Sequence, residues 1–233
     1  MSTHSVRRHL RVEIDVYDET IRRFIPGYDE MLRVAASTLA SVRPEVAIDL
    51  GAGTGALSAA ILTDGGTQTV ELIDVDDEML AQARMRLAPF GARVRFRKMS
   101  FAGPLPPCDA AAASLALHHV PTLDEKQAVY EGIRAALRPG GIFVNADAVV
   151  PSDPAGREAS YNAWADHMVA CGIERSRAFE HFAEWADEDT YFPLEQELEA
   201  MRAAGLDAEC VWRNGSMAVV AGRARRTQVR NAG

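Results

Sequence analysis

The strongest constraint on the fold is a glycine-rich turn that follows a short apolar run. Residues 45–50 are rich in β-forming side chains and predict a buried strand, and glycine occupies every second position of residues 51–55. Glycine tolerates positive φ and lets the backbone approach a ligand that a Cβ would repel. A helix that begins near Thr54 would offer free N–H groups to an anionic part of that ligand. The segment therefore predicts a cofactor-binding turn at the end of a buried strand.

Strands and helices alternate behind this turn. A capping box at Thr122 and Glu125 begins one of the helices, and Pro139-Gly140-Gly141 is expected to end it near Arg138. Alternating β and α units indicate an α/β fold with a parallel sheet and helices on both faces. The expected strands are 45–50, 69–74, 92–97, 109–115 and 142–149, and the expected helices run to about residue 63, over 77–88 and over 122–138.

Two segments are expected to lie outside this alternating core. Residues 12–40 read as a helical lid in which Pro26 and Gly27 separate two helices. Residues 151–192 are rich in aromatic side chains and are expected to form one or two helices inserted over the carboxyl edge of the sheet.

The end of the chain predicts a helix and a hairpin. A helix over 194–204 would end at Gly205, and strands over 207–213 and 216–222 would be joined by the turn Asn214-Gly215. We expect a single domain over 12–222, frayed residues 1–11 and a disordered tail over 223–233.

Composition excludes several classes of protein. The formal net charge is −8, so no basic face for nucleic acid is expected. No run of 18 apolar residues occurs, so no membrane span is expected. The three cysteines are far apart and show no metal-ligand spacing, which favours reduced thiols in a cytoplasmic protein and predicts no metal site. A homodimer is left open.

The glycine turn alone fits two classes of cofactor. Residues 51–56 satisfy the relaxed dinucleotide fingerprint, and Asp74 lies about twenty residues further on, where a ribose-binding acid is expected. A short-chain dehydrogenase would, however, need a tyrosine four residues before a lysine. Neither Lys98 nor Lys126 has one, and these are the two lysines of the chain.

Four motifs in order resemble those of small-molecule class I S-adenosylmethionine-dependent methyltransferases. They are residues 49–55 (DLGAGTG), 73–80 (IDVDDEML), 114–119 (SLALHH) and 137–141 (LRPGG). The resemblance covers about residues 15–222. It implies a Rossmann-like seven-stranded sheet in the order 3-2-1-4-5-7-6, with strand 7 antiparallel. It also implies S-adenosyl-L-methionine as the methyl donor for a small-molecule acceptor.

Two carboxylates are expected at the donor. Asp74 closes the second strand and is suited to accept hydrogen bonds from both ribose hydroxyls. It could instead cap the following helix, although Asp76 and Asp77 are available for that purpose. Asp49 is expected to organise the glycine turn or to bind the amino group of the donor through water.

One position departs from the family pattern. Where the family often has an acid toward adenine, this chain has Met99-Ser100-Phe101. Ser100 can still accept one hydrogen bond, and the backbone N–H of Phe101 can serve the adenine ring. The donor-site residues that we expect are Tyr28, Asp49, Gly51, Ala52, Gly53, Asp74, Val75, Met79, Ser100, Phe101 and Ser114.

The turn over residues 24–28 resembles the N-terminal lid of the carboxy-S-adenosylmethionine synthases, in which the matching tyrosine touches the cofactor. This resemblance implies that Tyr28 lies at the donor. Those synthases bind the extra carboxylate through an arginine in the late insertion, but residues 179–185 hold none, and Arg175 and Arg177 lie only nearby. We expect ordinary S-adenosylmethionine. Carboxylated-donor chemistry and a non-enzymatic S-adenosylmethionine-binding protein are the alternatives.

The acceptor side is less constrained. His118 follows the fourth strand and is a candidate general base, with packing or hydrogen bonding as the alternative role; the latter is preferred for His119. The aromatic side chains of the insertion could seal an acceptor into the crevice or simply pack on the sheet. The acceptor-site candidates are Arg22, Tyr161, Trp164, His181 and Trp185. The sequence identifies neither the acceptor nor the methylated atom.

Overall fold

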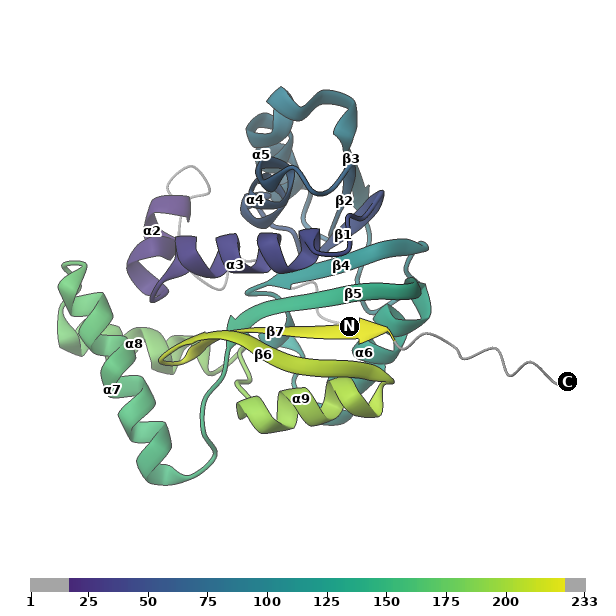
Figure 1. The fold of residues 1–233 in the computed structure, drawn as a ribbon. Coiled ribbons are helices and arrows are strands. Elements are labelled where there is room, and N and C mark those ends of the chain that lie inside the picture. Colours follow the sequence, from purple (N-terminus) through teal and green to yellow (C-terminus); the bar gives the residue numbers. More distant parts are fainter. Residues whose placement is uncertain (1–16, 225–233) are drawn as a thin grey trace, which may run out of the picture.

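A seven-stranded sheet forms the centre of the molecule, and helices cover both of its faces (Figure 1). The computed structural model describes residues 17–224. The strand order is β3-β2-β1-β4-β5-β7-β6, and β7 runs antiparallel to both of its neighbours. This confirms the order that the family resemblance implies. The strands are β1 (Val46–Leu50), β2 (Thr69–Asp74), β3 (Val94–Lys98), β4 (Cys108–Ser114), β5 (Leu137–Ala148), β6 (Leu206–Asn214) and β7 (Met217–Ala224).

The sheet separates two hydrophobic clusters because successive side chains of a strand point to opposite faces. In β1, for example, Ala47 belongs to one cluster and Ile48 to the other. Helices α3 (Tyr28–Ala40), α4 (Ala56–Asp64) and α5 (Asp77–Leu87) cover the first face. Helices α6 (Leu123–Ala136) and α9 (Leu194–Ala203) cover the second. Since both faces are buried, β1 and β4 are mainly apolar, with Asp49 and Asp109 as their charged residues.

The expected insertion forms two helices, α7 (Pro154–Ala170) and α8 (Arg175–Trp185), which lie beside the N-terminal helix α2 (Tyr17–Phe24) (Figure 1). Among residues 17–224 there are also two short 3₁₀ segments, η2 (Ala88–Arg93) and η3 (Leu117–His119). Gly27 is left-handed, with φ 67°, and it separates α2 from α3 as the sequence predicts. A Cβ at Gly27 would lie 2.7 Å from the Asn214 side chain and 3.3 Å from that of Trp212. The N-terminal turn therefore sits directly on the end of the β6–β7 hairpin.

Three predicted boundaries are wrong. Helix α6 ends at Ala136, and β5 begins immediately after it, because Leu137 pairs with Cys108 before a bulge. The hairpin turn is Gly215-Ser216 rather than Asn214-Gly215, since Asn214 still pairs with Met217.

The third boundary is the C-terminal end of the sheet. Strand β7 runs to Ala224, two residues into the predicted tail, because Arg223 pairs with Ile142 and Ala224 with Leu206. The predictions for residues 1–11 and 225–233 fall outside the described residues.

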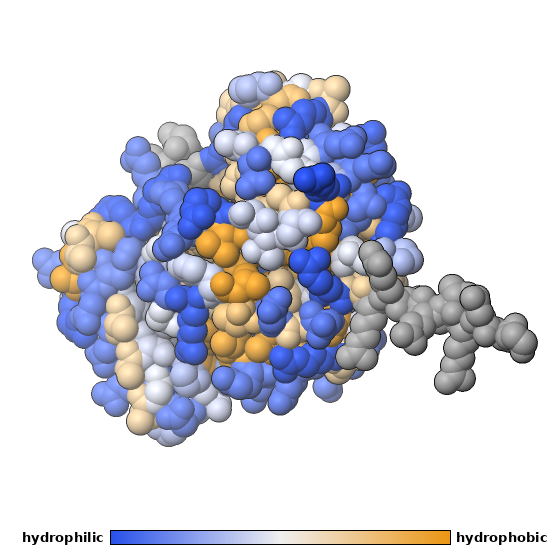
Figure 2. All heavy atoms as spheres, in the orientation of Figure 1, coloured by the Kyte–Doolittle hydropathy of each residue, from blue (hydrophilic) through white to orange (hydrophobic). Residues whose placement is uncertain are grey.

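The face seen in Figure 2 is largely hydrophilic, with an apolar area near its middle. Within residues 17–224, no helix combines the length and the apolar character that crossing a bilayer requires.

Candidate active site

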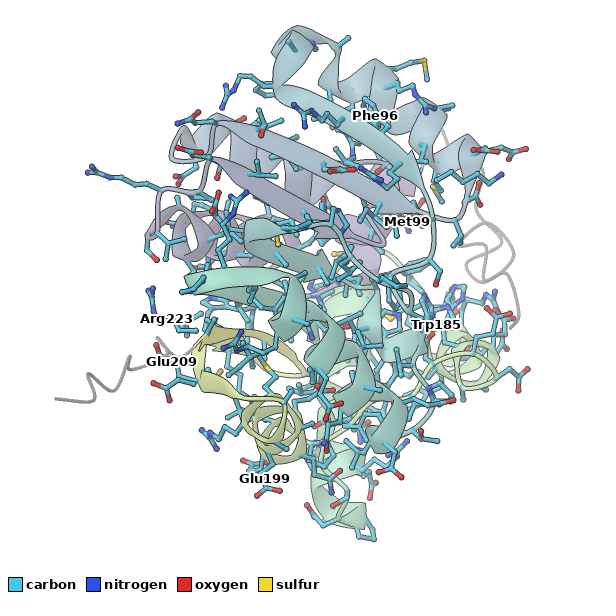
Figure 3. The ribbon with its side chains drawn as sticks, turned by 90° about the vertical axis from the view of Figure 1, so that its right-hand side faces the viewer. Phe96, Met99, Trp185, Glu199, Glu209 and Arg223 are labelled. Atoms are coloured by element: carbon cyan, nitrogen blue, oxygen red, sulfur yellow. The ribbon has the colours of Figure 1, made fainter. Side chains whose placement is uncertain are left out.

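The loops that follow β1, β3 and β4 meet at the carboxyl edge of the sheet. A Cβ at Gly51 would lie 2.7 Å from the Cβ of Ala116 and 3.6 Å from the ring of Phe101. Gly51 also has φ 64°, so both its conformation and its close approach require glycine. Figure 3 shows Met99, in the loop after β3, on the same side of the molecule as Trp185, whereas Glu209 and Arg223 lie on the opposite side.

Asp74 joins the end of β2 to the glycine turn. Its Oδ2 accepts a hydrogen bond from the N–H of Gly53 at 2.8 Å, and its Oδ1 accepts one from the N–H of Asp76 at 2.9 Å. Burial raises the pKa of the Asp74 carboxyl, although these backbone donors oppose the shift. The cap of α5 is Asp76, which accepts from the N–H groups of the next helical residues. The N-cap of α5 is therefore Asp76 and not Asp74.

Asp49 lies beneath the glycine turn. It is 1% exposed, and its Oδ2 accepts a hydrogen bond of 2.6 Å from the hydroxyl of Ser58 on α4. Burial raises the pKa of Asp49 to about 7 even though the bonds from Ser58 favour the carboxylate. The side chain thus ties β1 to the helix behind the turn, which corresponds to the first of its two expected roles.

The residues at this edge fit an adenosyl donor. A Cβ placed on Gly53 would meet no atom within 4 Å, so the turn faces open space. The buried hydroxyl of Ser114, at the end of β4, has no hydrogen-bond partner among the described residues. An open glycine turn beside a carboxylate and an unpartnered hydroxyl suits a ligand that carries ribose hydroxyls.

The other expected donor residues lie in several elements. The N–H of Ala52 donates to the carbonyl of Ile73 at 3.1 Å, and Ser100 accepts from the N–H of Ala102 at 3.2 Å. Val75 is half-buried, and Met79 is buried on α5. Tyr28 is buried at the start of α3, with the Arg22 guanidinium 5.8 Å from its ring centroid.

Asp147 fixes the loop that carries the family's fourth-strand motif. Its Oδ2 accepts from the N–H groups of Leu117 and His118, and its Oδ1 lies 2.6 Å from Nδ1 of His118. Oδ1 also accepts from the N–H of Ala148. Burial opposes ionisation, yet the charge and hydrogen bond of His118 hold the pKa of Asp147 below its usual value. One carboxylate on β5 thus determines where His118 lies.

His118 lies between two carboxylates. Its Nε2 is 3.6 Å from Oδ1 of Asp189, on the side opposite Asp147. Burial lowers the pKa of His118, but the two negative charges and the hydrogen bond to Asp147 outweigh it and raise the pKa to about 9. This pKa favours the charged imidazole at neutral pH, and the role of His118 as a general base stays a prediction.

Sequence reasoning missed the polar partners around His118. Asp189 lies beside His119 as well, with 3.1 Å between its Oδ1 and Nδ1 of His119, and it accepts a hydrogen bond from the Tyr191 hydroxyl. Deeper in the fold, Lys126 pairs with Glu197, which also accepts from Tyr130. Asp147 could have been noticed as an acid at the carboxyl end of a strand. The sequence carries no comparable signal for a lysine that is 1% exposed.

Four of the five acceptor-site candidates come together in the insertion. Trp164 and Trp185 are buried against each other with ring centroids 6.0 Å apart, and His181 stacks on Trp185. Tyr161 packs parallel to Trp164 at 6.4 Å. Burial and the nearby Arg177 lower the pKa of His181.

Arg22, the fifth acceptor-site candidate, does not join this aromatic group. Its guanidinium pairs with Asp29 at 3.0 Å and lines a groove between α3 and α4. The other nearby arginines of the insertion are also engaged: Arg175 pairs with Asp166, and Arg177 with Glu180 and Glu184. None of these contacts favours a site for the extra carboxylate of a carboxylated donor.

Comparison with known proteins identifies the family. Residues 48–143 match the model of a methyltransferase domain. An uncharacterized methyltransferase of Geobacillus kaustophilus is 30% identical over 164 residues, which cover 70% of this chain and 73% of the relative. A demethylmenaquinone methyltransferase of Clavibacter sepedonicus is 31% identical over 217 residues, or 88% of this chain and 83% of that one. The chain belongs to the class I S-adenosylmethionine-dependent methyltransferases.

The fold of this methyltransferase is shared with solved members. Human N-acetylserotonin methyltransferase in complex with S-adenosylmethionine superimposes with a TM-score of 0.60 at 17% identity, over 95% of this chain and 63% of the human one. S-adenosyl-L-methionine is thus the cofactor of this methyltransferase, in agreement with the open glycine turn. A carboxy-S-adenosylmethionine synthase of Campylobacter curvus is 28% identical over 144 residues, covering 60% of this chain and 61% of the synthase. This match supports the resemblance of the lid only weakly.

Proposed function

We propose that this methyltransferase acts on a small-molecule acceptor held between the carboxyl edge of the sheet, the lid over residues 12–40 and the insertion over residues 151–192. The observation that carries the proposal is a backbone contact. The N–H of Thr190, in the segment that returns from the insertion, donates a hydrogen bond of 2.8 Å to the carbonyl of His118. The insertion therefore ends on the loop that follows β4, where a reacting group beside the donor would lie.

The lid and the insertion also contact each other. The indole N–H of Trp164 donates to the carbonyl oxygen of Phe24, and the ring of Phe24 packs edge-on against Trp185 at 5.3 Å. Two segments joined in this way can exclude water from the crevice, which strengthens its polar contacts and suppresses hydrolysis. These contacts support Trp164 and Trp185 as the framework of the acceptor pocket.

The reaction is an in-line displacement. The acceptor atom forms a bond to the methyl carbon while the carbon–sulfur bond of the sulfonium breaks, and the electron pair of that bond goes to sulfur. Alignment of the two reactants supplies much of the rate acceleration. We assign His118 to the polarisation of the acceptor through Nε2, since Asp147 occupies Nδ1 and the pKa of about 9 keeps the ring charged at neutral pH.

Charge and composition support a small acceptor. A chain of net charge −8 offers no continuous track for phosphates, so we do not expect tRNA or DNA as the substrate. The cysteines Cys108, Cys171 and Cys210 are free thiols, which supports action in the cytoplasm. The relative named for demethylmenaquinone makes quinones and their reduced quinols a reasonable first class of acceptor to assay.

The test is a labelled-methyl assay on small-molecule extracts. The purified chain and labelled S-adenosylmethionine are incubated with metabolite extract, with quinols and phenols, or with total tRNA. Labelled small molecules in the organic or aqueous extract, and none in tRNA, would support the proposal. Salt-sensitive labelling of tRNA would overturn it. Calorimetry with S-adenosylhomocysteine and with NAD controls for donor binding, and NAD is expected to give no heat.

A further inference from the structure

Three potential metal-ligand atoms meet beneath the insertion. They are Nε2 of His118, Nδ1 of His119 and Oδ1 of Asp189, and all lie within 4.8 Å of one another. The carboxylate oxygen is 3.1 Å from the His119 nitrogen and 3.6 Å from the His118 nitrogen. Metal–ligand bonds of about 2.0–2.2 Å place neighbouring ligands roughly 3–3.6 Å apart. The spacing of these atoms therefore suits a bound cation without a large rearrangement.

Outer groups hold the three side chains in place. Asp147 lies 2.6 Å from Nδ1 of His118, which fixes the tautomer that presents a lone pair at Nε2. The Tyr191 hydroxyl donates to Oδ2 of Asp189, so the other oxygen of that carboxylate remains turned toward the histidines. A carboxylate behind a histidine ligand is the usual outer-shell arrangement of a metal centre.

The backbones that carry the ligands are tied together as well. The N–H of Thr190 donates to the carbonyl of His118 at 2.8 Å. The N–H of Asp189 donates to the carbonyl of Trp185 at 2.8 Å, so the carboxylate is set directly by the end of α8 (Trp185 is labelled in Figure 3). The loop after β4 and the segment after α8 thus present their ligands to each other as one unit.

The charges of the region match a divalent cation. The buried cation Lys126 forms its ion pair with Glu197. Two other carboxylates, Asp147 and Asp189, lie beside His118 and His119. A metal at Nε2 would displace the proton of His118 and would take over from that N–H in polarising the acceptor. With both imidazoles then neutral, a divalent metal balances these two negative charges.

We propose that His118, His119 and Asp189 bind one divalent transition-metal ion. Two imidazole nitrogens and one carboxylate oxygen are a donor set for Zn²⁺ or Fe²⁺, and they disfavour Mg²⁺, which takes oxygen ligands. Three protein ligands leave a further coordination position open, as in catalytic metal sites. The side chains of His118, His119 and Asp189 are 9%, 14% and 2% exposed, so the three ligands are largely shielded from bulk water.

A metal at this site would also restrict the acceptor of the proposed methyl transfer. This part of the inference rests on the proposed function. An acceptor bound at the open position would coordinate through an oxygen or a sulfur atom, as a hydroxyl, phenol, enol or thiol does. Such an acceptor would lose its proton more readily on the metal. The metal site therefore favours acceptors with an acidic O–H or S–H group over amine and carbon nucleophiles.

The experiment measures metal binding without any donor or acceptor. Chelator-treated full-length protein is titrated with Co²⁺, followed by visible absorption and by displacement with Zn²⁺. The expected result is one equivalent of Co²⁺ with ligand-field bands, displacement by Zn²⁺, and no competition from Mg²⁺. Wild-type protein that gives no Co²⁺ bands and takes up no stoichiometric Zn²⁺ would overturn the proposal, whatever the variants do.

Matched variants locate the metal. His119→Gln and Asp189→Asn should lower Zn²⁺ affinity by more than the roughly 10- to 100-fold expected for Asp147→Asn, an outer-shell change. Asp187→Asn, an exposed carboxylate two residues from Asp189, and His167→Gln on α7 should leave the affinity unchanged. Equal affinity in Asp189→Asn and Asp187→Asn would refute the assignment. Metal binding without any methylated product would leave the site standing and would count against the proposed function instead.

Discussion

The indole nitrogen of Trp164 donates a hydrogen bond of 2.6 Å to the carbonyl oxygen of Phe24, across 140 positions of the chain. The bond is buried, and it joins helix α7 of the insertion to the last residue of α2. Because both segments lie outside the sheet-and-helix core, this contact makes them one packed unit over the carboxyl edge.

Loss of that bond should weaken the fold measurably. Trp164→Phe keeps an aromatic ring but leaves the Phe24 carbonyl buried without its partner, so we expect destabilisation by about 1–3 kcal/mol. Urea unfolding measures it. Tyr161→Phe is the control on the same helix, since it removes only an exposed contact of 3.4 Å with Arg157. Equal midpoints for the two variants would show that the indole bond contributes nothing.

Asp74 should contribute to donor affinity and little to the cap of α5. Asp74→Ala is expected to weaken S-adenosylhomocysteine binding by roughly 1.5–3 kcal/mol, the range for hydrogen bonds to a charged group. Asp77→Ala, which removes an exposed carboxylate paired with Lys98, should bind like the wild type. Calorimetry of both folded variants decides the matter. Unchanged affinity in Asp74→Ala would mean that the carboxylate serves the glycine turn alone.

Asp49 should make the stability of the donor-free protein depend on pH. Its folded pKa of about 7 lies above the unfolded value near 4, so the folded state binds the extra proton between these limits. Stability should therefore fall as pH rises from about 4 to about 7 and should level off above that window. Asp49→Asn removes the titrating group and should flatten this part of the profile. Parallel profiles for the two proteins would contradict the prediction.

Removing the cation of the buried pair Lys126–Glu197 should destabilise the protein far more than removing the cation of an exposed ion pair. Lys126→Met leaves the Glu197 carboxylate buried without its cation and should cost about 3–5 kcal/mol of unfolding free energy. Adding Glu197→Gln removes the stranded charge and keeps an acceptor for Tyr130, so the double variant should recover much of that loss. Lys98→Met, at an exposed pair, should cost at most about 1 kcal/mol. Equal losses of unfolding free energy in Lys98→Met and Lys126→Met, measured by denaturant unfolding, would refute this account.

The core elements could be predicted because their sequence signals are local. The run before Gly51 and the acids at the ends of β1 and β2 lie where alternating β and α units predict them. The order of the strands came from the family resemblance, and the structure confirms it. The sequence predicts the hairpin turn one residue early, because Asn-Gly is a strong turn signal but Gly215 and Ser216 form the loop here.

The polar network around His118 could not be predicted because its members are distant in the chain. Asp189 lies 70 positions after His119, and Glu197 lies 71 after Lys126. Each residue alone fits a solvated helix or loop, and only the packing of α8 and α9 on their neighbours brings the charges together. Tyr28 is buried at the start of α3, and its place at the donor, which the resemblance of the lid implies, stays a prediction.

Strand β7 is the last described strand in the chain, yet it lies between β5 and β6. During synthesis, one edge of β5 therefore stays unpaired until the residues from Met217 onward leave the ribosome. The N-terminal turn also lacks its packing partners until this stage, because Gly27 packs against Trp212 and Asn214. A nascent chain that stalls before Met217 presents an open strand to other chains, which makes it a natural client for chaperones.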